Sequence, residues 1–578
     1  MTDQSQIIIE VNGREVEARP GEMLLAALQR AGIQVPTLCR MEGLLPTGAC
    51  RMCVVEIEGA RGLVPSCAFP VTSSLKVKTH SNRAVQARKT IIELLLANHP
   101  DDCLYCVRNG SCELQNLAED LGVRERRYAG ERTRQQLDSS SPSLVRDPEK
   151  CILCGKCVRV CEEVQGVAAI DFVGRGSKTV IDTAFRQGLN MSTCINCGQC
   201  VVVCPTGALH EQSYAKEIMD AIADPKKVVV VQHAPSISVT LGEEFGMKAG
   251  SDVAGALVTA LRRLGFDRVF DTSFSADLTI MEEASELVHR VKTGGRLPMM
   301  TSCSPGWIKF VEQFYPDLVP NLSSCKSPQQ MMGALIKSYF AEREGLDPRQ
   351  IFSVSIMPCT AKKFEANRPE MAPGGVSDVD AVMTTRELVR LIRKHGLDLK
   401  DLPSDTADTP FGERTTAGKI FGASGGVMEA ALRTAYKLLT GTELELAAIP
   451  AVRGLDGRKE LELEIGDLKV GVAVVSGLGN AHKLMQEIQN GRSGLHFVEV
   501  MSCPGGCIAG GGQPLHHDTE AVRARMQGLY KLDRESNLRT SHSNEAVQRI
   551  YREFLGEPLG EKSHALLHTH YHKRSDVI

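Results

Sequence analysis

Nearly all the cysteines of this chain lie in groups with regular spacing. Nineteen of its twenty cysteines fall into five such groups, four in the first half of the 578 residues and one spread over the second half. Clustered thiolates are the usual ligands of iron–sulfur clusters, and some arrangements bind zinc instead. The pattern therefore predicts a series of metal sites. The last differs from the others because its ligands come from distant segments.

The first group has four cysteines in the pattern C-x10-C-x2-C-x13-C, namely Cys39, Cys50, Cys53 and Cys67. Four thiolates of this kind can hold a [2Fe–2S] cluster. Zinc is the alternative, but zinc sites are usually built from two close cysteine pairs, whereas this group has one pair and two separate cysteines. We therefore expect a [2Fe–2S] cluster here.

The second group adds a histidine in the pattern H-x3-C-x2-C-x5-C, formed by His99, Cys103, Cys106 and Cys112. One imidazole and three thiolates can bind either zinc or a [4Fe–4S] cluster, and the local spacing does not separate the two. The position of this group between two redox modules favours a [4Fe–4S] cluster with one histidine ligand.

The third and fourth groups form an internal repeat, CILCGKCVRVC and CINCGQCVVVC. Their cysteines follow C-x2-C-x2-C-x3-C, and in ferredoxins with two clusters the fourth cysteine of each run ligates the other cluster. One predicted [4Fe–4S] cluster therefore uses Cys151, Cys154, Cys157 and Cys204. The other uses Cys194, Cys197, Cys200 and Cys161.

The fifth group is drawn from three segments, TSCSPGW at 301–307, MPCTAKK at 357–363 and EVMSCPGGCIAGGGQP at 499–514. They contain Cys303, Cys359, Cys503 and Cys507. Each segment follows an apolar run typical of a strand, and side chains at the carboxyl ends of parallel strands meet at one crevice. We expect these cysteines to lie together. Gly505, Gly506 and the run from Gly510 to Gly512 would let the backbone approach a large inorganic group.

These three segments resemble the signature sequences of [FeFe]-hydrogenases, and the upstream groups follow the module order of the long clostridial-type members. The resemblance covers essentially the whole chain. It is nearest to catalytic subunits of cytoplasmic NADP-reducing or electron-bifurcating hydrogenase complexes. It implies the reaction 2H⁺ + 2e⁻ ⇌ H₂ at an H-cluster, in which a [4Fe–4S] cubane is bridged through a cysteine to a diiron unit carrying CO, cyanide and azadithiolate. By position, Cys507 is the bridge, with Cys359 and Cys503 as cubane ligands.

The resemblance also assigns residues around the diiron unit, which would have almost no other covalent anchor. Lys362 matches the family's cyanide partner. Three residues match the loop that contacts the other cyanide, namely Ala234, Pro235 and Ser236. The residues that match the cavity wall are Gln329, Met357, Phe421 and Met501.

The first signature departs from the commonest family pattern of two adjacent cysteines, of which the first is assigned to proton transfer and the second to the cubane. This chain has Cys303 followed by Ser304. A literal alignment puts Ser304 at the ligand position, yet thiolates are the usual protein ligands of cubanes. We expect Cys303 to be the ligand and Ser304 a weaker proton relay, and the opposite assignment stays open.

The rest of the family's proton route matches Glu283, Ser323, Glu286 and Arg290. The two glutamates are three residues apart and so share one face of a helix. Without the resemblance, they would be interpreted as solvated charges. Electrons are expected to pass from the terminal cubane to the two ferredoxin-type clusters, with the His99 group and the [2Fe–2S] cluster as two candidate exits.

Three features lie outside these sites. Cys325 is expected to be a small buried apolar residue. The stretch GASGG at 422–426 lacks the lysine of a phosphate-binding loop and is expected to begin a helix near the active site. A docked amphipathic helix with a polar tail, rather than a metal site, is expected for the histidines near the C-terminus, namely His564, His568, His570 and His572.

Hydrophobic patterning places these groups in a multidomain α/β and α+β chain. Residues 1–80 open with an alternating strand, an Asn-Gly turn and a short helix, typical of a β-grasp [2Fe–2S] module. Residues 81–123, with a helix near 84–98, form the His-ligated module. The charged, Ser-rich stretch at 124–150 is interpreted as a surface linker, with 124–144 as its core and the two-cluster ferredoxin module at 145–210. From 224 to 578, apolar runs that alternate with helical patterns predict a catalytic domain with parallel sheets and a small-subunit-like C-terminal segment.

Composition narrows the function further. The chain has 67 basic and 70 acidic residues, a net charge of −3, which argues against binding nucleic acid or a membrane surface. The absence of an export signal or long apolar run predicts a cytoplasmic protein. No dinucleotide-binding fingerprint is present, so NAD(P) and flavin are expected on partner subunits of a hetero-oligomer, with ferredoxin as a further partner. The alternatives are a non-catalytic iron–sulfur assembly or carrier protein and a hydrogen sensor.

Overall fold

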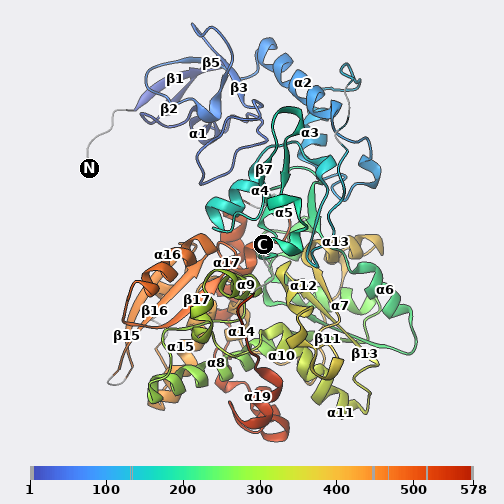
Figure 1. Ribbon diagram of the computed structural model, residues 1–578, viewed down its shortest axis with the longest axis vertical. Coiled ribbons are helices and arrows are strands. Elements are labelled where there is room, and N and C mark those ends of the chain that lie inside the picture. Colours follow the sequence, from blue (N-terminus) through green and yellow to red (C-terminus); the bar gives the residue numbers. More distant parts are fainter. Residues whose placement is uncertain are drawn as a thin grey trace.

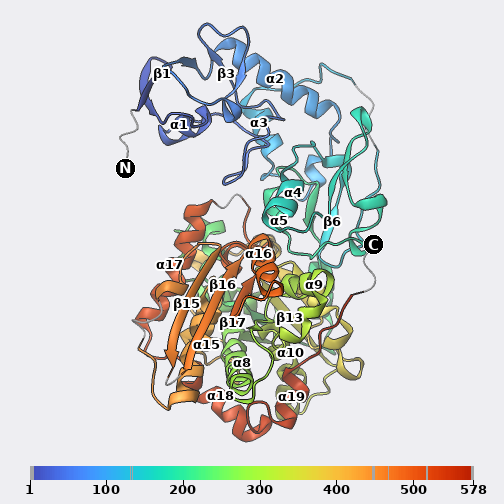
Figure 2. The same cartoon turned by 60° about the vertical axis from the view of Figure 1, so that its left-hand side comes forward.

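The computed structural model describes residues 6–129, 132, 134–445, 450–465, 468–515 and 518–574. Figures 1 and 2 show the N-terminal module and the helix that follows it at the top, the segment around residues 150–210 in the middle and the large α/β domain below. Among the described residues, no helix is both long enough and apolar enough to cross a membrane. The expected multidomain α/β and α+β architecture is confirmed.

The N-terminal module is a five-stranded sheet in the order β2-β1-β5-β3-β4, covered by one helix. Strands β1 (Ile7–Val11) and β2 (Arg14–Ala18) form a hairpin whose turn, Asn12 and Gly13, has φ of 51° and 79°. This left-handed geometry is what an Asn-Gly turn favours. The remaining elements are α1 (Leu24–Arg30), β3 (Val54–Ile57), β4 (Val64–Pro65) and β5 (Lys76–Lys78).

Two small modules follow. Helices α2 (Asn82–Ala97) and α3 (Glu113–Asp120) frame the second cysteine group. In the third module, the repeated sequences give repeated structure, because α4 (Lys156–Arg159) and α5 (Gln199–Val203) each begin after a glycine with φ near 70°. Its strands are β6 (Leu144–Arg146), β7 (Asp171–Val173), β8 (Val180–Asp182) and β9 (Leu209–Glu211).

The surface linker expected over 124–150 is shorter than predicted. Ser141, Ser143 and Leu144 are buried, and β6 pairs antiparallel with β9. The last part of that stretch, including the end of the 124–144 core, therefore belongs to the third module. The Ser-rich composition suggested an exposed linker, but Ser141 is buried and its hydroxyl donates a hydrogen bond to the Asn196 side chain.

The large domain contains two four-stranded sheets. The first is parallel throughout, in the order β11-β10-β13-β14, with β10 (Val228–His233), β11 (Arg268–Asp271), β13 (Ile351–Met357) and β14 (Ala381–Thr384). The second has the order β12-β17-β16-β15, with β12 (Met299–Met300), β15 (Arg458–Ile465), β16 (Leu468–Ser476) and β17 (Leu495–Met501). Only β15 runs antiparallel to its neighbour. The parallel sheets predicted from the apolar runs after residue 224 are present, and β12 joins the second of them.

Helix α8 (Ser273–Thr293) lies between the two sheets. Phe274, Leu278 and Met281 pack into the core beside the first sheet, whereas Ile280 and Leu287 pack into the core beside the second. A helix that is buried on all sides needs such a two-sided apolar surface. The acidic residues of α8, from Asp277 to Glu286, are therefore buried rather than solvated.

The other helices cover the outer faces of the sheets or close the domain. They are α6 (Ala215–Ala223), α7 (Ala254–Arg263), α9 (Pro305–Phe314), α10 (Pro328–Leu335), α11 (Ala341–Glu344), α12 (Ala361–Ala366), α13 (Thr385–Lys394), α14 (Thr416–Ile420), α15 (Gly426–Thr440), α16 (Leu478–Gln489), α17 (Thr519–Glu535), α18 (Glu545–Ile550) and α19 (Glu561–Leu567). Helix α15 begins at the stretch 422–426, as expected from its glycines.

One buried carboxylate ties α8 to distant parts of the chain. Asp277 accepts hydrogen bonds from the backbone N–H and hydroxyl of Thr415 (2.7 and 2.6 Å), the Gly418 N–H (3.1 Å), the Ser541 hydroxyl (2.8 Å) and the Asn544 amide (2.9 Å). It thereby fixes α14 and the C-terminal region against α8.

Changing Asp277 to Asn should lower the thermal unfolding midpoint by at least about 4 °C, because an amide has one accepting oxygen and buried donors left unpaired cost about 1–3 kcal/mol each. Circular dichroism melting measures this. Asp401→Asn, at an exposed position, is the control. An unchanged midpoint for Asp277→Asn would contradict the proposed role of this network.

Candidate active site

A buried cavity lies where the carboxyl ends of the two sheets meet. Its cavity volume is about 80 Å³. Its walls come from the residues that follow β10, β11, β12, β13 and β17, as the strand pattern predicted. All four cysteines of the fifth group line it, although they are separated by up to about two hundred residues of sequence.

The residues predicted for this site converge. Those that line the cavity are Ala234, Pro235, Ser236, Cys303, Ser304, Gln329, Met357, Cys359, Lys362, Phe421, Met501, Cys503 and Cys507. The stretch 422–426, expected near the active site, contributes Gly422. The sequence analysis missed Thr272, Ala276, Pro305, Pro328, Pro358 and Ser502. Three of these adjoin a predicted cysteine or its neighbour and could have been found by extending the motifs. Thr272 and Ala276 carry no local signal because only the packing of α8 brings them there.

Glu499 is a further residue that sequence reasoning missed. It is fully buried, and its carboxylate accepts the N–H groups of Gly425 and Met428 at the start of α15, both at 2.7 Å. Burial raises its pKa, and its charge contributes to the raised pKa of Cys507. It fixes the position of the loop before α15 beside the cavity.

The surroundings of the four thiols in the cavity suit coordination of a metal cation. Burial raises the pKa of Cys303, Cys359, Cys503 and Cys507, to about 12 for Cys507, and neighbouring thiolate charge adds to the shift for Cys503 and Cys507. Desolvated thiols of this kind ionise when a metal ion coordinates them. The donor set therefore fits a metal or metal cluster.

Polar groups face the cavity from two sides. The Ser236 hydroxyl is fully buried and has no hydrogen-bond partner among the described residues. The Lys362 ammonium donates to the Cys303 carbonyl (3.1 Å) and to Glu365 (2.8 Å). Met357, Phe421 and Met501 supply buried apolar walls. A bound group with polar ends and apolar sides fits this lining, because an orphaned buried hydroxyl indicates a missing partner.

Cys303 and Ser304 have different surroundings. The Ser304 hydroxyl lies 2.8 Å from that of Ser502 and accepts the Ser502 N–H at 3.3 Å, which places it beside Cys503. After burial, the largest influences on the pKa of Cys303 are the charges of Glu283 and Cys507, which both raise it. Cys303 therefore lines the cavity within electrostatic range of Glu283.

From Cys303, a row of polar side chains leads outward. Glu283 is 1% exposed, and both its oxygens lack a hydrogen-bond partner among the described residues. Burial, and then the charge of Glu286, raise the pKa of Glu283 to about 8. Glu286 accepts from the Ser323 hydroxyl (3.0 Å) and pairs with Arg290 (2.5 Å). Ser323, Glu286 and Arg290 are thus joined by hydrogen bonds, and Glu283 lies within electrostatic range of Glu286 and Cys303.

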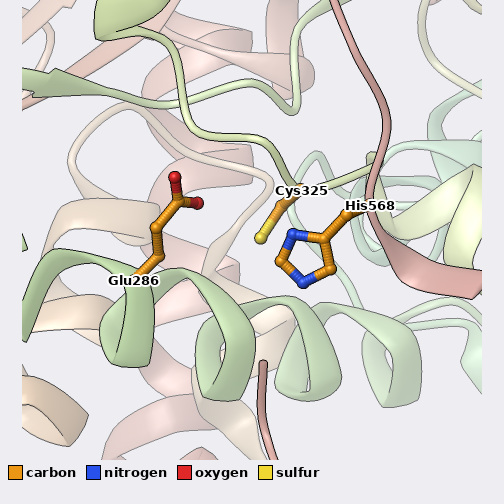
Figure 3. Close-up of side chains that lie close together, drawn as sticks. All are labelled: Glu286, Cys325 and His568. Carbon is orange, nitrogen blue, oxygen red and sulfur yellow. The ribbon is translucent and has the colours of Figure 1, made fainter. Parts of the chain in front are cut away.

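Glu286 also approaches Cys325 and His568, and Figure 3 shows the three side chains turned toward one another. Their candidate ligand atoms lie within 4.8 Å of each other, close enough for a metal ion. However, His568 Nδ1 lies 2.8 Å from the Ser324 hydroxyl and Nε2 lies 3.1 Å from Glu282. Since both ring nitrogens are engaged, this group is a hydrogen-bonded network rather than an open metal site.

Two expectations from the sequence concern residues of this network, namely Cys325 and the C-terminal histidines. Cys325 is fully buried, as expected. The C-terminal histidines follow the prediction only in part, because α19 docks on the domain but His568 is 5% exposed instead of lying in a polar tail. Its hydrogen bond to Glu282 explains why a polar ring is buried.

The upstream cysteines gather into separate small sites. One cavity is lined by Cys151, Cys154, Cys157 and Cys204. A second is lined by Cys161, Cys194, Cys197 and Cys200. This grouping is the one expected if the fourth cysteine of each run ligates the cluster of the other run.

His99 is set up as a ligand. Its Nδ1 lies 3.0 Å from the Pro100 carbonyl, which can only accept, so Nδ1 carries the proton. Its buried Nε2 has no partner among the described residues. A bond from one nitrogen to a carbonyl is the usual way of orienting a histidine whose other nitrogen coordinates metal. Burial also lowers the pKa of His99, which favours the neutral ring.

The first cysteine group is equally compact. Contact with the Cys50 thiol lowers the pKa of Cys39 to about 5, and contact with the Cys67 thiol lowers that of Cys53 to about 6. The four thiols therefore lie together as two adjoining pairs. Such an arrangement fits a cluster held by four cysteines.

The five sites form a row. The module with α2 and α3 packs against the first module, with Cys50 and Cys112 in one apolar cluster. It is joined to the third module by the hydrogen bond from Glu113 N–H to the Pro205 carbonyl (3.0 Å). At the other end, a Cβ on Gly511 would lie 2.1 Å from the Cys197 carbonyl, so the glycine run approaches the third module's backbone as well as the cavity.

Known families match the chain module by module. The upstream matches are the 2Fe-2S iron-sulfur cluster binding domain at 4–82, the NADH-ubiquinone oxidoreductase-G iron-sulfur binding region at 88–127 and the 4Fe-4S dicluster domain at 150–208. Residues 227–511 match the C-terminal domain of the iron only hydrogenase large subunit, and residues 519–574 match the iron hydrogenase small subunit. The chain therefore carries [2Fe–2S] and [4Fe–4S] domains before an H-cluster domain.

Relatives match over nearly the whole length. The NADP-reducing hydrogenase subunit HndD of Solidesulfovibrio fructosivorans is 47% identical over 99% of both chains. Iron hydrogenase 1 of Clostridium pasteurianum is 41% identical over 98% of this chain and 100% of its own. The structure of apo [FeFe]-hydrogenase HydA1 from Chlamydomonas reinhardtii superimposes with a TM-score of 0.57 at 42% identity, covering 64% of this chain and 100% of that one. Together with the cavity and its cysteines, these matches show that the chain belongs to the iron-only, or [FeFe]-, hydrogenase family.

Proposed function

We propose that this hydrogenase subunit interconverts protons and H₂ in the cavity between its two sheets and exchanges electrons with partner subunits through the row of upstream clusters. The observation that carries the proposal is the convergence of four cysteines, Lys362 and the Ser236 hydroxyl, unpartnered among the described residues, on one buried cavity. The modules are proposed to follow the boundaries expected from the sequence, 1–80, 81–123, 145–210 and 224–578, with the third extended toward residue 138.

Cys359, Cys503 and Cys507 are proposed to hold the cubane, with Cys507 as the thiolate shared with the diiron unit. The H-cluster, when bound, supplies the iron atoms and the basic amine at which H₂ is split and formed. The protein supplies anchoring and dry packing. Lys362 and Ser236 would donate hydrogen bonds to the cyanide ligands, and the apolar walls would exclude water.

Protons are proposed to enter and leave through Cys303, Glu283, Ser323, Glu286 and Arg290. Because the carboxyl of Glu283 has a pKa of about 8, it is protonated near neutral pH and can both give and take a proton. The position of Cys303 beside Glu283 supports the assignment left open by the sequence, with Cys303 as the proton carrier. Ser304, held by Ser502 next to Cys503, then lies on the cubane side.

Electrons are proposed to leave through the two ferredoxin-type clusters. Gln199 and Thr360 support this route, because they bond the third module directly to the loops of the cavity at 3.1 and 2.7 Å. Beyond them, the His99 site offers an exit, since Leu104 and Tyr105 beside Cys103 are 85% and 90% exposed. Exposed aromatic and aliphatic side chains next to a redox site suit a docking partner.

The partners are proposed to be flavin- and iron–sulfur-containing subunits that reduce NAD(P) in the cytoplasm. The name of the Solidesulfovibrio relative supports NADP, and no dinucleotide-binding fingerprint occurs in this chain. An assembly or carrier role without the diiron unit is less supported, because the chain matches catalytic hydrogenases over nearly its full length.

Changing Cys507 to Ala should abolish H₂ turnover, because the shared thiolate is lost. The reduced upstream clusters should stay visible by electron paramagnetic resonance, which shows that the other modules are intact. Retained turnover in this variant would refute the assignment of Cys507.

Changing Cys303 to Ser should slow turnover by about a hundredfold or more while iron per chain stays at the wild-type value, since general acid–base steps contribute about that much. Iron analysis and H₂ evolution are measured on the same sample. Loss of the cubane from this variant would instead make Cys303 a cluster ligand.

Changing Glu283 to Gln should slow H₂ evolution by about a hundredfold with iron content unchanged, because an amide cannot relay a proton. In the wild type, the rate should fall as pH rises through about 8, where the Glu283 carboxyl loses its proton. Lys292→Gln, exposed on the same helix, serves as the control. Wild-type rates in Glu283→Gln would mean that protons travel elsewhere.

A further inference from the structure

A buried arginine lies between two of the upstream sites. Arg108 is 1% exposed, and Nε, Nη1 and Nη2 of its guanidinium all lack a hydrogen-bond partner among the described residues. Among the residues that the structure describes, no carboxylate lies within ion-pair distance of the Arg108 guanidinium. A guanidinium carries five N–H donors and stays charged in proteins, so burying it unpaired is strongly unfavourable. Its environment must contain an acceptor that the described polypeptide does not provide.

Arg108 lies where the His99 site and the nearer ferredoxin-type site meet. Cys112 belongs to the first site and Cys204 to the second, and the residues that follow them are joined by the hydrogen bond from Glu113 N–H to the Pro205 carbonyl. Gly207 marks the same contact, because a Cβ there would lie 2.7 Å from Cys106 Sγ and 3.7 Å from Arg108 Cγ.

The charged groups around Arg108 are engaged with one another. Arg386 pairs with Glu211 at 3.0 Å, and Lys150 pairs with Asp102 at 3.1 Å and with Asp147 at 3.0 Å.

The charges that act on Arg108 itself are mainly thiolates. Burial lowers the pKa of Arg108, and thiolate charge on Cys204 and Cys112 opposes that shift, as Glu113 does to a smaller extent. Glu113 lies 3.4 Å from Lys156. The negative charge that faces Arg108 therefore comes chiefly from cysteines of two different sites.

Iron–sulfur clusters are the acceptors that suit this position. Their net charge is negative when thiolates ligate them, and hydrogen bonds to their sulfurs help to set their reduction potentials. Each added electron makes a cluster more negative, so a fixed cation with N–H donors stabilises the reduced form more than the oxidised form. One planar guanidinium with several donors can serve two acceptors at once.

We infer that Arg108 donates hydrogen bonds to the sulfurs of both clusters, the His99-ligated one and the one held by Cys151, Cys154, Cys157 and Cys204, and raises both reduction potentials together. Arg108 is thus a positioning and tuning residue for electron transfer between them. The inference rests on the proposed assignment of these residues as cluster ligands. It adds a role for a residue that belongs to no cluster motif.

The test is a redox titration of the full-length protein with its upstream clusters, followed by electron paramagnetic resonance, in Arg108→Gln and Arg108→Lys. The two signals are assigned by their loss in Cys106→Ala and Cys154→Ala. Arg124→Gln, exposed immediately after the same module, is the matched control. Iron per chain is measured in every variant, so that loss of a cluster is distinguished from a change in potential. The ligand assignment itself would be refuted if Cys106→Ala and Cys154→Ala kept both signals.

In Arg108→Gln, the ratio of reduced to oxidised cluster at a fixed potential should fall at least tenfold for both signals, a shift of about 59 mV for one electron. Arg108→Lys should shift the potentials of both signals in the same direction by a smaller amount, because lysine keeps the charge but lacks the planar set of N–H donors of the guanidinium. Arg124→Gln should match the wild type.

Wild-type potentials in Arg108→Gln with full iron content would overturn the inference. A shift of only one signal would also overturn it, since Arg108 would then serve a single cluster. If Arg108→Gln fails to retain iron, Arg108→Lys decides the matter, and unchanged potentials in that variant would reject the role.

Discussion

The burial of thiols from distant segments in one cavity with a mainly apolar lining is the constraint on which the rest of this structure depends. Four cysteines lie at or beyond the carboxyl ends of strands from two sheets, and burial keeps their pKa values high. Such a site is unfavourable until cationic iron compensates the thiolate charge. Helix α8 between the sheets and the Glu499 carboxylate before α15 hold the loops that create it. The fold is thus organised around a place where charge can be buried only with its cofactor.

In the proposed mechanism, protons and electrons take separate routes from that cavity. The proposed proton route runs along α8, where Glu283 and Glu286 are buried because the helix is packed on both sides. The proposed electron route leaves through the glycine run, whose backbone approaches Cys197 too closely for any side chain. Separation of this kind lets protons move through carboxyl and hydroxyl groups while electrons move through iron–sulfur sites. Arg108 extends the same logic, since the negative charge near its buried guanidinium comes chiefly from the cysteines of the sites on either side.

Much of this arrangement could be predicted from sequence, because short motifs carry the chemistry. The cysteine spacings identify the five groups, and apolar runs before TSCSPGW and MPCTAKK locate the strand ends. The Asn-Gly hairpin and the glycine-led helix α15 follow from backbone preferences that act locally. Resemblance to a family, rather than spacing, was needed to select Glu283 and Glu286 from the many acidic residues.

What could not be predicted depends on packing between distant segments. Ser141 and Ser143 lie in a stretch whose composition is typical of a linker, but both are buried in the third module. His568 is in a histidine-rich segment that suggested a polar tail, yet Glu282 and Ser324 bind both of its ring nitrogens. Arg108 differs from a surface arginine only in what surrounds it. In each case, the tertiary partner decides the role, and no local pattern encodes that partner.

The central claim is that the cavity between the sheets holds a diiron unit with CO and cyanide ligands, anchored by Cys507 and contacted by Lys362 and Ser236. Infrared spectroscopy of the full-length protein, produced with cofactor maturation, tests it most directly. The account predicts absorption bands of CO and cyanide bound to iron. Their absence from protein whose upstream clusters are fully assembled would contradict it.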